Sequence, residues 1–178
     1  MRVVARLALA TLAASWLAAS PLAAQSNPRR SQRQELMQMV GATKIEAMYI
    51  RPVARGREVW GALVPYGKPW TPSADSVMRL TFSTDVQVGG QTLPAGSYGI
   101  WAIPDSTQWT VIFSKRAVAF HTGGNYQESN DALRVTARVD ALPHVETLTL
   151  SFPVVDGRKA TLQIHWGTRA VTLPIEVP

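Results

Sequence analysis

The chain contains no cysteine among its 178 residues and only three histidines. The absence of cysteine excludes disulfides, thiolate metal sites and a cysteine nucleophile. The histidines are His121, His144 and His165, and no two of them have the spacing of a zinc-binding HxH or HExxH motif. We therefore expect no metal and no other cofactor, and a fold that is stabilised by its hydrophobic core.

Sequence motifs of catalysis are also missing. No serine lies in a GxSxG nucleophile elbow, and neither Gly89-Gly90 nor Gly123-Gly124 precedes the lysine-bearing helix of a phosphate loop. The argument for an enzyme is limited to three polar residues in expected loops, Asp75, His121 and Asp131. We assign no catalytic residue and expect a protein that is not an enzyme.

One long apolar run occurs, and it lies at the N-terminus. Residues 1–6 carry two arginines and no acid, residues 7–19 are dominated by Ala and Leu, and small residues precede Gln25. This pattern predicts a secretory signal peptide over residues 1–24. The run is shorter than the roughly 20 residues of a membrane span. We expect an exported protein, periplasmic or extracellular, with no stable membrane span after cleavage.

Positive charge is modest and scattered, with a formal net charge of +6. Arg29, Arg30 and Arg33 lie close together, within a segment predicted to be a flexible leader over residues 25–42. A nucleic-acid-binding protein would carry a basic stripe with motif support. We expect no nucleic-acid partner, and nothing in the sequence specifies an oligomeric state.

Alternation of apolar and polar residues dominates the rest of the chain, residues 43–178, and predicts half-buried strands. Residues 98–103 and 109–113 are apolar on both parities, which is typical of central strands that are covered on both faces. Turn signals occur at Gly89-Gly90, 140–143, 156–157 and 167–168. The pattern predicts one all-β domain, an antiparallel β-sandwich or jelly-roll.

Residues 31–40 allow two interpretations. Ser31 and Gln34 have the spacing of a capping box that would open a short helix. Alternatively, Met37 and Met39 belong to a strand that pairs with residues 44–50.

The segment from Arg51 to Asp75 is the most unusual, because it combines four prolines, three glycines, three arginines, two tryptophans and a tyrosine. Trp109, Trp166 and Trp101 are expected in the core, whereas Trp60, Tyr66 and Trp70 either pack in the core or form a binding surface. We expect Arg51 to satisfy loop carbonyls, and Arg57 either to do the same or to contact a ligand.

The chain resembles a known family through a succession of short blocks. They are 49–52 (YIRP), 55–57 (RGR), 61–68 (GALVPYGK), Trp70, 93–98 (LPAGSY), 109–113 (WTVIF) and 131–135 (DALRV). Their order and spacing are similar to the exported bacterial family called domain of unknown function 2911, over about residues 43–177. The resemblance implies no activity, substrate or catalytic residue, because none is established for that family.

The chain departs from that family directly after Trp70. Relatives continue with Arg-Thr-Gly-Ala-Asn-Glu, whereas this chain has Thr-Pro-Ser-Ala-Asp-Ser at residues 71–76. An arginine, an amide and a carboxylate are lost, and Asp75 is gained. If these positions bind a ligand in relatives, the chemistry of the site differs here.

These observations predict a non-catalytic module that binds a small polar or glycan-like ligand. The ligand-binding candidates are Arg57, Tyr66, Trp70, Asp75, His121 and Tyr126. The alternative is a structural or envelope-associated domain that contacts another protein.

Overall fold

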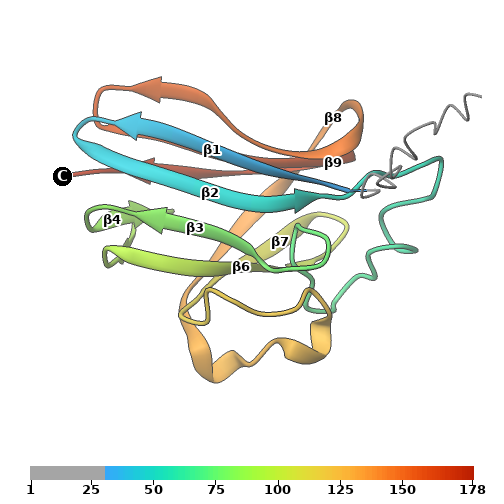
Figure 1. Cartoon of the computed structure of the whole chain (residues 1–178). Coiled ribbons are helices and arrows are strands. Elements are labelled where there is room, and N and C mark those ends of the chain that lie inside the picture. The colour runs from blue at the N-terminus through green and yellow to red at the C-terminus, as the bar shows by residue number, and fades with distance from the viewer. Residues whose placement is uncertain (1–30) are drawn as a thin grey trace, which may run out of the picture.

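The computed structural model describes residues 31–178, and antiparallel strands make up most of that length (Figure 1). The signal peptide predicted over residues 1–24 and the first part of the predicted leader lie outside the described residues. The elements are β1 (Gln32–Val40), β2 (Thr43–Arg51), β3 (Met78–Phe82), β4 (Val86–Val88), β5 (Gln91–Leu93), β6 (Gly96–Pro104), β7 (Gln108–Ser114), the 3₁₀ turns η1 (Gly123–Asn125) and η2 (Glu128–Asn130), β8 (Asp131–Asp156) and β9 (Lys159–Glu176).

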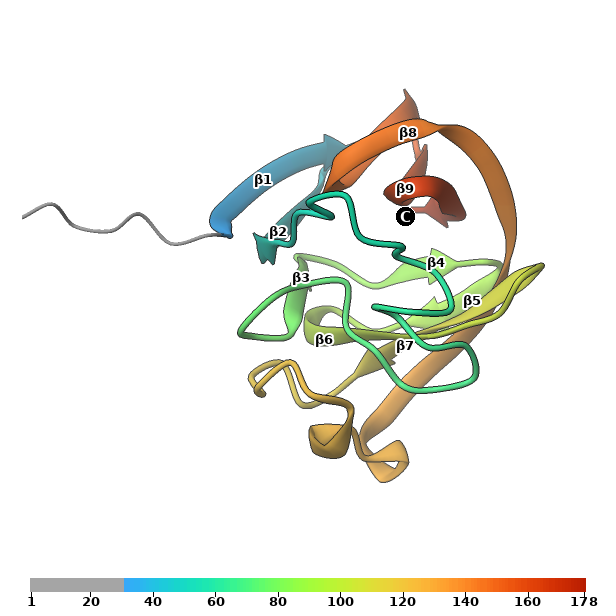
Figure 2. The same ribbon diagram turned by 90° about the vertical axis from the view of Figure 1, so that its right-hand side faces the viewer.

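All nine strands belong to one sheet, in the order β1-β2-β3-β6-β7-β8-β9-β4-β5, and all neighbours are antiparallel. The prediction of a single antiparallel all-β domain is confirmed. The sheet is continuous because β8 pairs with β7 along its first residues and with β9 along the remainder. Figure 2 shows that the sheet curls round on itself, and buried side chains from its strands form the main core cluster.

The first strand corrects the predicted leader. Residues 32–40 form β1 and pair one by one with β2, from Gln32 opposite Arg51 to Val40 opposite Thr43. The strand forms because even-numbered residues such as Leu36 and Val40 pack against the core while the odd-numbered residues face outward. The strand interpretation of residues 31–40 is therefore confirmed, and the ordered domain begins about ten residues earlier than predicted.

Two predicted turns are bends within long strands. β8 and β9 form one antiparallel ribbon from Val139 opposite Val171 to Asp156 opposite Lys159, and the register shifts between Ala141 and Val145. The extra residues of β8 form a bulge, which bends the ribbon instead of ending it. Gly167 lies opposite Val145 with φ of +58°, a backbone conformation that glycine adopts without strain.

The core has two parts, on the two faces of the central strands β6 and β7. The main cluster holds Trp109 and Trp166, and a smaller cluster holds Trp101, Val77 and Ile112 under the segment 115–131. The three tryptophans predicted to be in the core are buried. The two-sided apolar pattern of β6 and β7 reflects this cover on both faces.

Candidate ligand-binding site

The Arg51–Asp75 segment, called the connecting loop from here on, is tied to the sheet by side-chain hydrogen bonds. Arg51 Nε donates to the carbonyl of Leu148 at 3.0 Å, and its Nη2 donates to Thr149 Oγ1 at 3.1 Å. The indole Nε1 of Trp60 donates to the carbonyl of Trp166 at 3.1 Å. Arg51 is structural, but its acceptors lie on β8 and not in the loop as predicted. The irregular backbone is held by donors that reach across to β8 and β9.

Four tryptophans form one cluster under the connecting loop. The Trp70 ring lies nearly parallel to that of Trp166, at 12° with centroids 6.2 Å apart. It meets the rings of Trp60 and Trp109 edge to face, at 5.7 and 6.0 Å. Trp60 is 8% exposed, whereas Trp70 is only partly buried. Trp70 is therefore held by three other rings and keeps part of its surface exposed.

Trp70 lines a cleft of about 340 Å³, here called the Trp70 cleft. Ligand pockets of proteins span roughly 300–1,000 Å³, so the volume suits one small molecule. Aromatic and aliphatic surface and basic side chains combine in its wall. The residues with these roles are Arg55, Arg57, Leu63, Trp70, His121 and Trp166.

Arg57 lines the cleft and also holds the loop together. Its Nε donates to the carbonyl of Ala54 and its Nη2 to the carbonyl of Val53, both at 2.8 Å. The guanidinium is thereby fixed in one orientation, and its Nη1 has no hydrogen-bond partner within residues 31–178. Both roles considered for Arg57 are compatible, since two donors stabilise the loop and a third remains for a ligand.

His121 reaches the cleft from the segment that follows β7. Its backbone N–H donates to the carbonyl of Asp75 at 3.2 Å, and its ring lies 4.5 Å from that of Phe120. Nδ1 of His121 is buried without a hydrogen-bond partner in the described chain. Asp75 is exposed, does not line the cleft, and contributes by placing His121.

Tyr66 lies on the other side of the connecting loop, at a second and more open cavity of about 550 Å³. Arg169 sits 5.8 Å above the centre of its ring, and Arg169 Nη1 donates to the carbonyl of Ser106 at 2.6 Å. Arg57 lines both cavities. The Tyr66 ring thus packs under a guanidinium and does not line the Trp70 cleft.

Tyr126 belongs to a third location. Its ring packs against Trp101 at 5.6 Å, and its hydroxyl donates to Asp131 Oδ2 at 2.7 Å. Burial, with the neighbouring carboxylate, raises the pKa of Tyr126, and burial also raises the pKa of Asp131. Arg134 Nη1 approaches the same carboxylate at 3.3 Å. This arrangement anchors the 115–131 segment to β8.

The structure therefore brings together three of the six predicted ligand residues, Arg57, Trp70 and His121. The prediction missed Trp166 because its parity placed it in the core, where it does lie; only the packing of the loop reveals its edge at the cleft. The clustering of arginines in the loop sequence was a signal that also included Arg55. Among residues 31–178, no group of three or more histidine or acidic side chains is arranged to hold a metal ion.

The residues that follow Trp70, where the chain departs from the family pattern, are structural. Thr71 Oγ1 donates to the carbonyl of Ile100 at 2.7 Å and accepts the N–H of Met78 at 3.1 Å. Ser73 Oγ accepts the N–H of Ile50 at 2.9 Å. Both side chains are buried, and their hydroxyls form hydrogen bonds with backbone groups of β2, β3 and β6. Ser73 also lines the Trp70 cleft.

Comparison with known proteins gives one finding. The family model described as protein of unknown function (DUF2911) matches residues 31–175, which includes β1 and nearly all of β9. No curated protein and no solved structure matches the chain. Within residues 31–178, no helix is long and apolar enough to cross a membrane.

Proposed function

Because the chain belongs to the DUF2911 family, whose description assigns no function, we propose its role from the Trp70 cleft: it is an exported module that binds a small polar, sugar-like ligand. The single observation that carries this proposal is the partly exposed Trp70 ring, which is held by three other tryptophans and lines a cleft of ligand size. Export follows from the signal-peptide pattern of residues 1–24.

The chemistry of the cleft favours a ligand with one flat apolar face and several hydroxyl groups. A pyranose ring has an apolar face that packs on an aromatic ring and hydroxyl groups that remain available for polar contacts. Arg57 supplies a fixed planar donor in the cleft wall, and His121 supplies a ring nitrogen that donates or accepts. Hydroxyl groups at the ligand edge would meet both residues.

Tryptophan fluorescence tests the proposal, because Trp70 and Trp166 both line the cleft. The purified mature protein is titrated with neutral monosaccharides, disaccharides and sugar acids, and the dissociation constants are measured. Trp70→Leu should weaken binding at least ~10-fold, equivalent to about 1.4 kcal/mol, while Trp70→Phe, which keeps a ring, should lose less. Because Trp70 also contacts the core cluster, the thermal midpoint of each variant is recorded.

Tyr126→Phe serves as the matched control, since Tyr126 does not line the cleft. It should leave the dissociation constant unchanged. The proposal is contradicted if no sugar in the panel binds the wild type, or if a folded Trp70→Leu protein binds as tightly as the wild type.

A further inference from the structure

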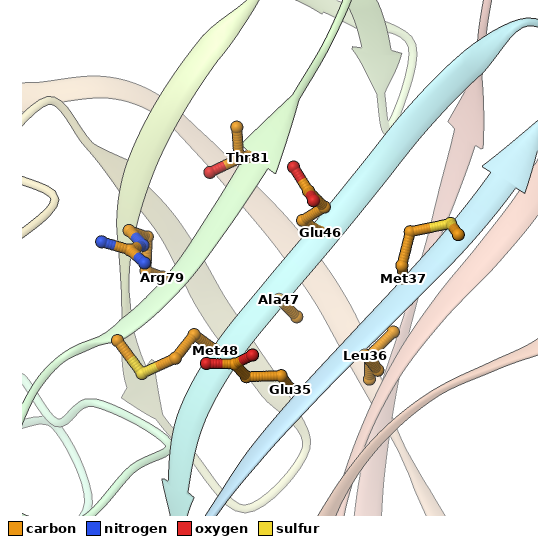
Figure 3. Close-up of a pocket in the computed structure, with 8 residues that line it drawn as sticks. All are labelled: Glu35, Leu36, Met37, Glu46, Ala47, Met48, Arg79 and Thr81. Atoms are coloured by element: carbon orange, nitrogen blue, oxygen red, sulfur yellow. The ribbon is translucent and has the colours of Figure 1, made fainter.

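The Trp70 cleft differs in charge from the other cavities. Its wall includes Arg55 and Arg57, and no aspartate or glutamate of the described chain lines it. Four further cavities within residues 31–178 each include at least one acidic residue, namely Glu35 and Glu46, Glu176, Asp85 and Glu176, and Glu58. Figure 3 shows the first of these, a groove that Glu35, Glu46 and Arg79 line together. The Trp70 cleft instead has basic side chains alone, which favours an anion.

Arg57 has donors left for an anion while it holds the connecting loop. A guanidinium has five N–H bonds, and Arg57 uses two of them, one at Nε for Ala54 and one at Nη2 for Val53, so three remain. A carboxylate accepts two parallel hydrogen bonds from one guanidinium. The hydrogen bonds to the loop also orient Arg57 before a ligand arrives, so less side-chain entropy is lost on binding.

Arg55 adds a second positive charge, which Glu146 partly offsets. The backbone N–H of Arg55 donates to Glu146 Oε1, so the carboxylate lies close to this residue. Glu146 does not line the cleft. One unit of negative charge on the ligand therefore matches the charge that Arg57 supplies.

His121 adds a polar group to the same wall. Its Nδ1 is buried and has no hydrogen-bond partner among the described residues. A buried polar atom without a partner costs free energy, and a ligand oxygen that pairs with it removes that cost. His121 therefore favours a ligand with several oxygen atoms.

We propose that the ligand of the Trp70 cleft is a sugar acid, whose ring packs on Trp70 and whose carboxylate binds Arg57. This inference rests on the proposed function, because it specifies the ligand class of the same cleft. A volume of about 340 Å³ suits one small molecule, so the ring and its carboxylate share one cavity with both side chains. A carboxylate is planar and carries one charge, as the guanidinium of Arg57 does.

Matched ligands test the carboxylate in the wild-type protein. Glucose, glucuronamide and glucuronate share one ring and carry a hydroxymethyl group, a neutral amide and a carboxylate at C6; the galactose series is measured in parallel. Isothermal titration calorimetry of the mature protein at neutral pH and low salt gives the dissociation constants. In at least one series, the acid should bind at least ~10-fold more tightly than its amide, because hydrogen bonds to charged groups are the stronger ones.

The outcomes separate this inference from the proposed function. Equal affinity for neutral sugars and acids would overturn the sugar acid and leave the proposed sugar-like ligand standing. Absence of binding by every member of both series would overturn both. Sugar 6-phosphates form a further arm, and they should bind more weakly than the acids. Tighter binding of the phosphates would assign a different anion to the cleft and overturn the carboxylate.

Three variants test the role of Arg57 through the ratio of acid to amide affinity. Arg57→Gln should remove most of the preference for the acid, and Arg57→Lys, which keeps the charge but not the planar fork, should keep part of it. Lys68→Gln removes a positive charge from the same loop at an exposed residue outside the cleft and should leave the preference unchanged. A preference that survives in folded Arg57→Gln, or that Lys68→Gln removes equally, would overturn the role of Arg57.

The loop contacts of Arg57 require a check on folding, since its substitution also removes donors to Ala54 and Val53. The thermal midpoint of each variant is measured, and damage to the loop should weaken the acid and the amide alike without changing their ratio. If Arg57→Gln does not fold, the salt dependence of the wild type decides. The preference for the acid should shrink as salt is added, because salt screens exposed charges, and a preference that salt does not change would overturn the ion pair.

Discussion

The Tyr49 hydroxyl accepts the backbone N–H of Leu150 at 3.0 Å, which joins β2 to β8 across a region where the two strands form no ladder. The same hydroxyl donates to Gln34 Oε1 at 3.0 Å, and burial raises its pKa. A single side chain thus links three strands and helps the curled sheet to enclose its core.

Removal of that hydroxyl by Tyr49→Phe should lower the free energy of unfolding by about 1–3 kcal/mol, because the buried N–H of Leu150 loses its acceptor. Urea unfolding at neutral pH measures the change. Tyr66→Phe is the control: Tyr66 is exposed, and its substitution should alter stability by less than about 0.5 kcal/mol. Equal effects of both substitutions would show that the contact between β2 and β8 does not depend on the Tyr49 hydroxyl.

Thr71 offers a test of the segment that departs from the family pattern. Thr71→Val keeps the shape of the side chain but removes the acceptor for Met78 N–H and the donor to Ile100, so we expect a loss of about 1–3 kcal/mol. Thr71→Ser retains the hydroxyl and should lose less. Chemical denaturation measures the free energy of unfolding of both variants. A Thr71→Val variant as stable as the wild type would refute the structural role of this hydroxyl.

Two adjacent glycines differ in the space that they have. A Cβ at Gly123 would lie 2.7 Å from the carbonyl oxygen of Pro69, whereas a Cβ at Gly124 would meet nothing within 4 Å. Gly123→Ala should therefore push the His121 segment away from the connecting loop and cost about 1–3 kcal/mol. Gly124→Ala should be nearly neutral. Thermal unfolding of the two variants provides the comparison, and similar midpoints would contradict the close approach.

The buried carboxyl of Asp131 predicts a pH dependence. Burial raises its pKa above the ordinary value of 3.8, with Tyr126, Arg134 and Glu128 as the charged or polar neighbours. The Asp131 side chain is 8% exposed, and its burial penalises the charged form in the folded state. Its contribution to stability is then fully present below the unfolded pKa and is lost as the pH rises through the folded pKa.

Asp131→Asn cannot titrate, so the thermal midpoint of the wild type minus that of Asp131→Asn should fall as the pH rises from about 3 to 7. Asp105→Asn is a control of opposite sign, because hydrogen bonds from Ser106 and Thr107 lower the pKa of Asp105. For Asp105 the stabilisation is present above the unfolded pKa and is lost as the pH falls. A flat difference for Asp131 would contradict its raised pKa.

Local sequence patterns were sufficient for most of the strands. The period-two alternation of residues 78–82 predicted β3, and Gly89-Gly90 predicted the hairpin of β4 and β5, where both glycines have positive φ. These predictions succeeded because a strand buries alternate residues wherever its partner lies. The pattern did not reveal that residues 140–143 continue β8, since a bulge and a turn use similar residues.

Only three of the six candidate residues chosen from the sequence lie together at the Trp70 cleft. The composition of the connecting loop indicated Arg57 and Trp70, which lie together at the cleft. Asp75, Tyr66 and Tyr126 looked equivalent to them but lie elsewhere, since residue type does not specify which loops meet. His121 lies at the same cleft, and its place depends on the hydrogen bond of its backbone to Asp75.

The sequence by itself determined the family, the all-β antiparallel class, the absence of thiol chemistry and the importance of the connecting loop. Tertiary structure alone decided that Trp70 stacks on Trp166 at the wall of a cleft, and that the Tyr49 hydroxyl links β2 to β8. The physical reason is that burial periodicity is local to each strand, whereas a cleft, or a bond between strands that share no ladder, exists only once distant strands are placed beside one another.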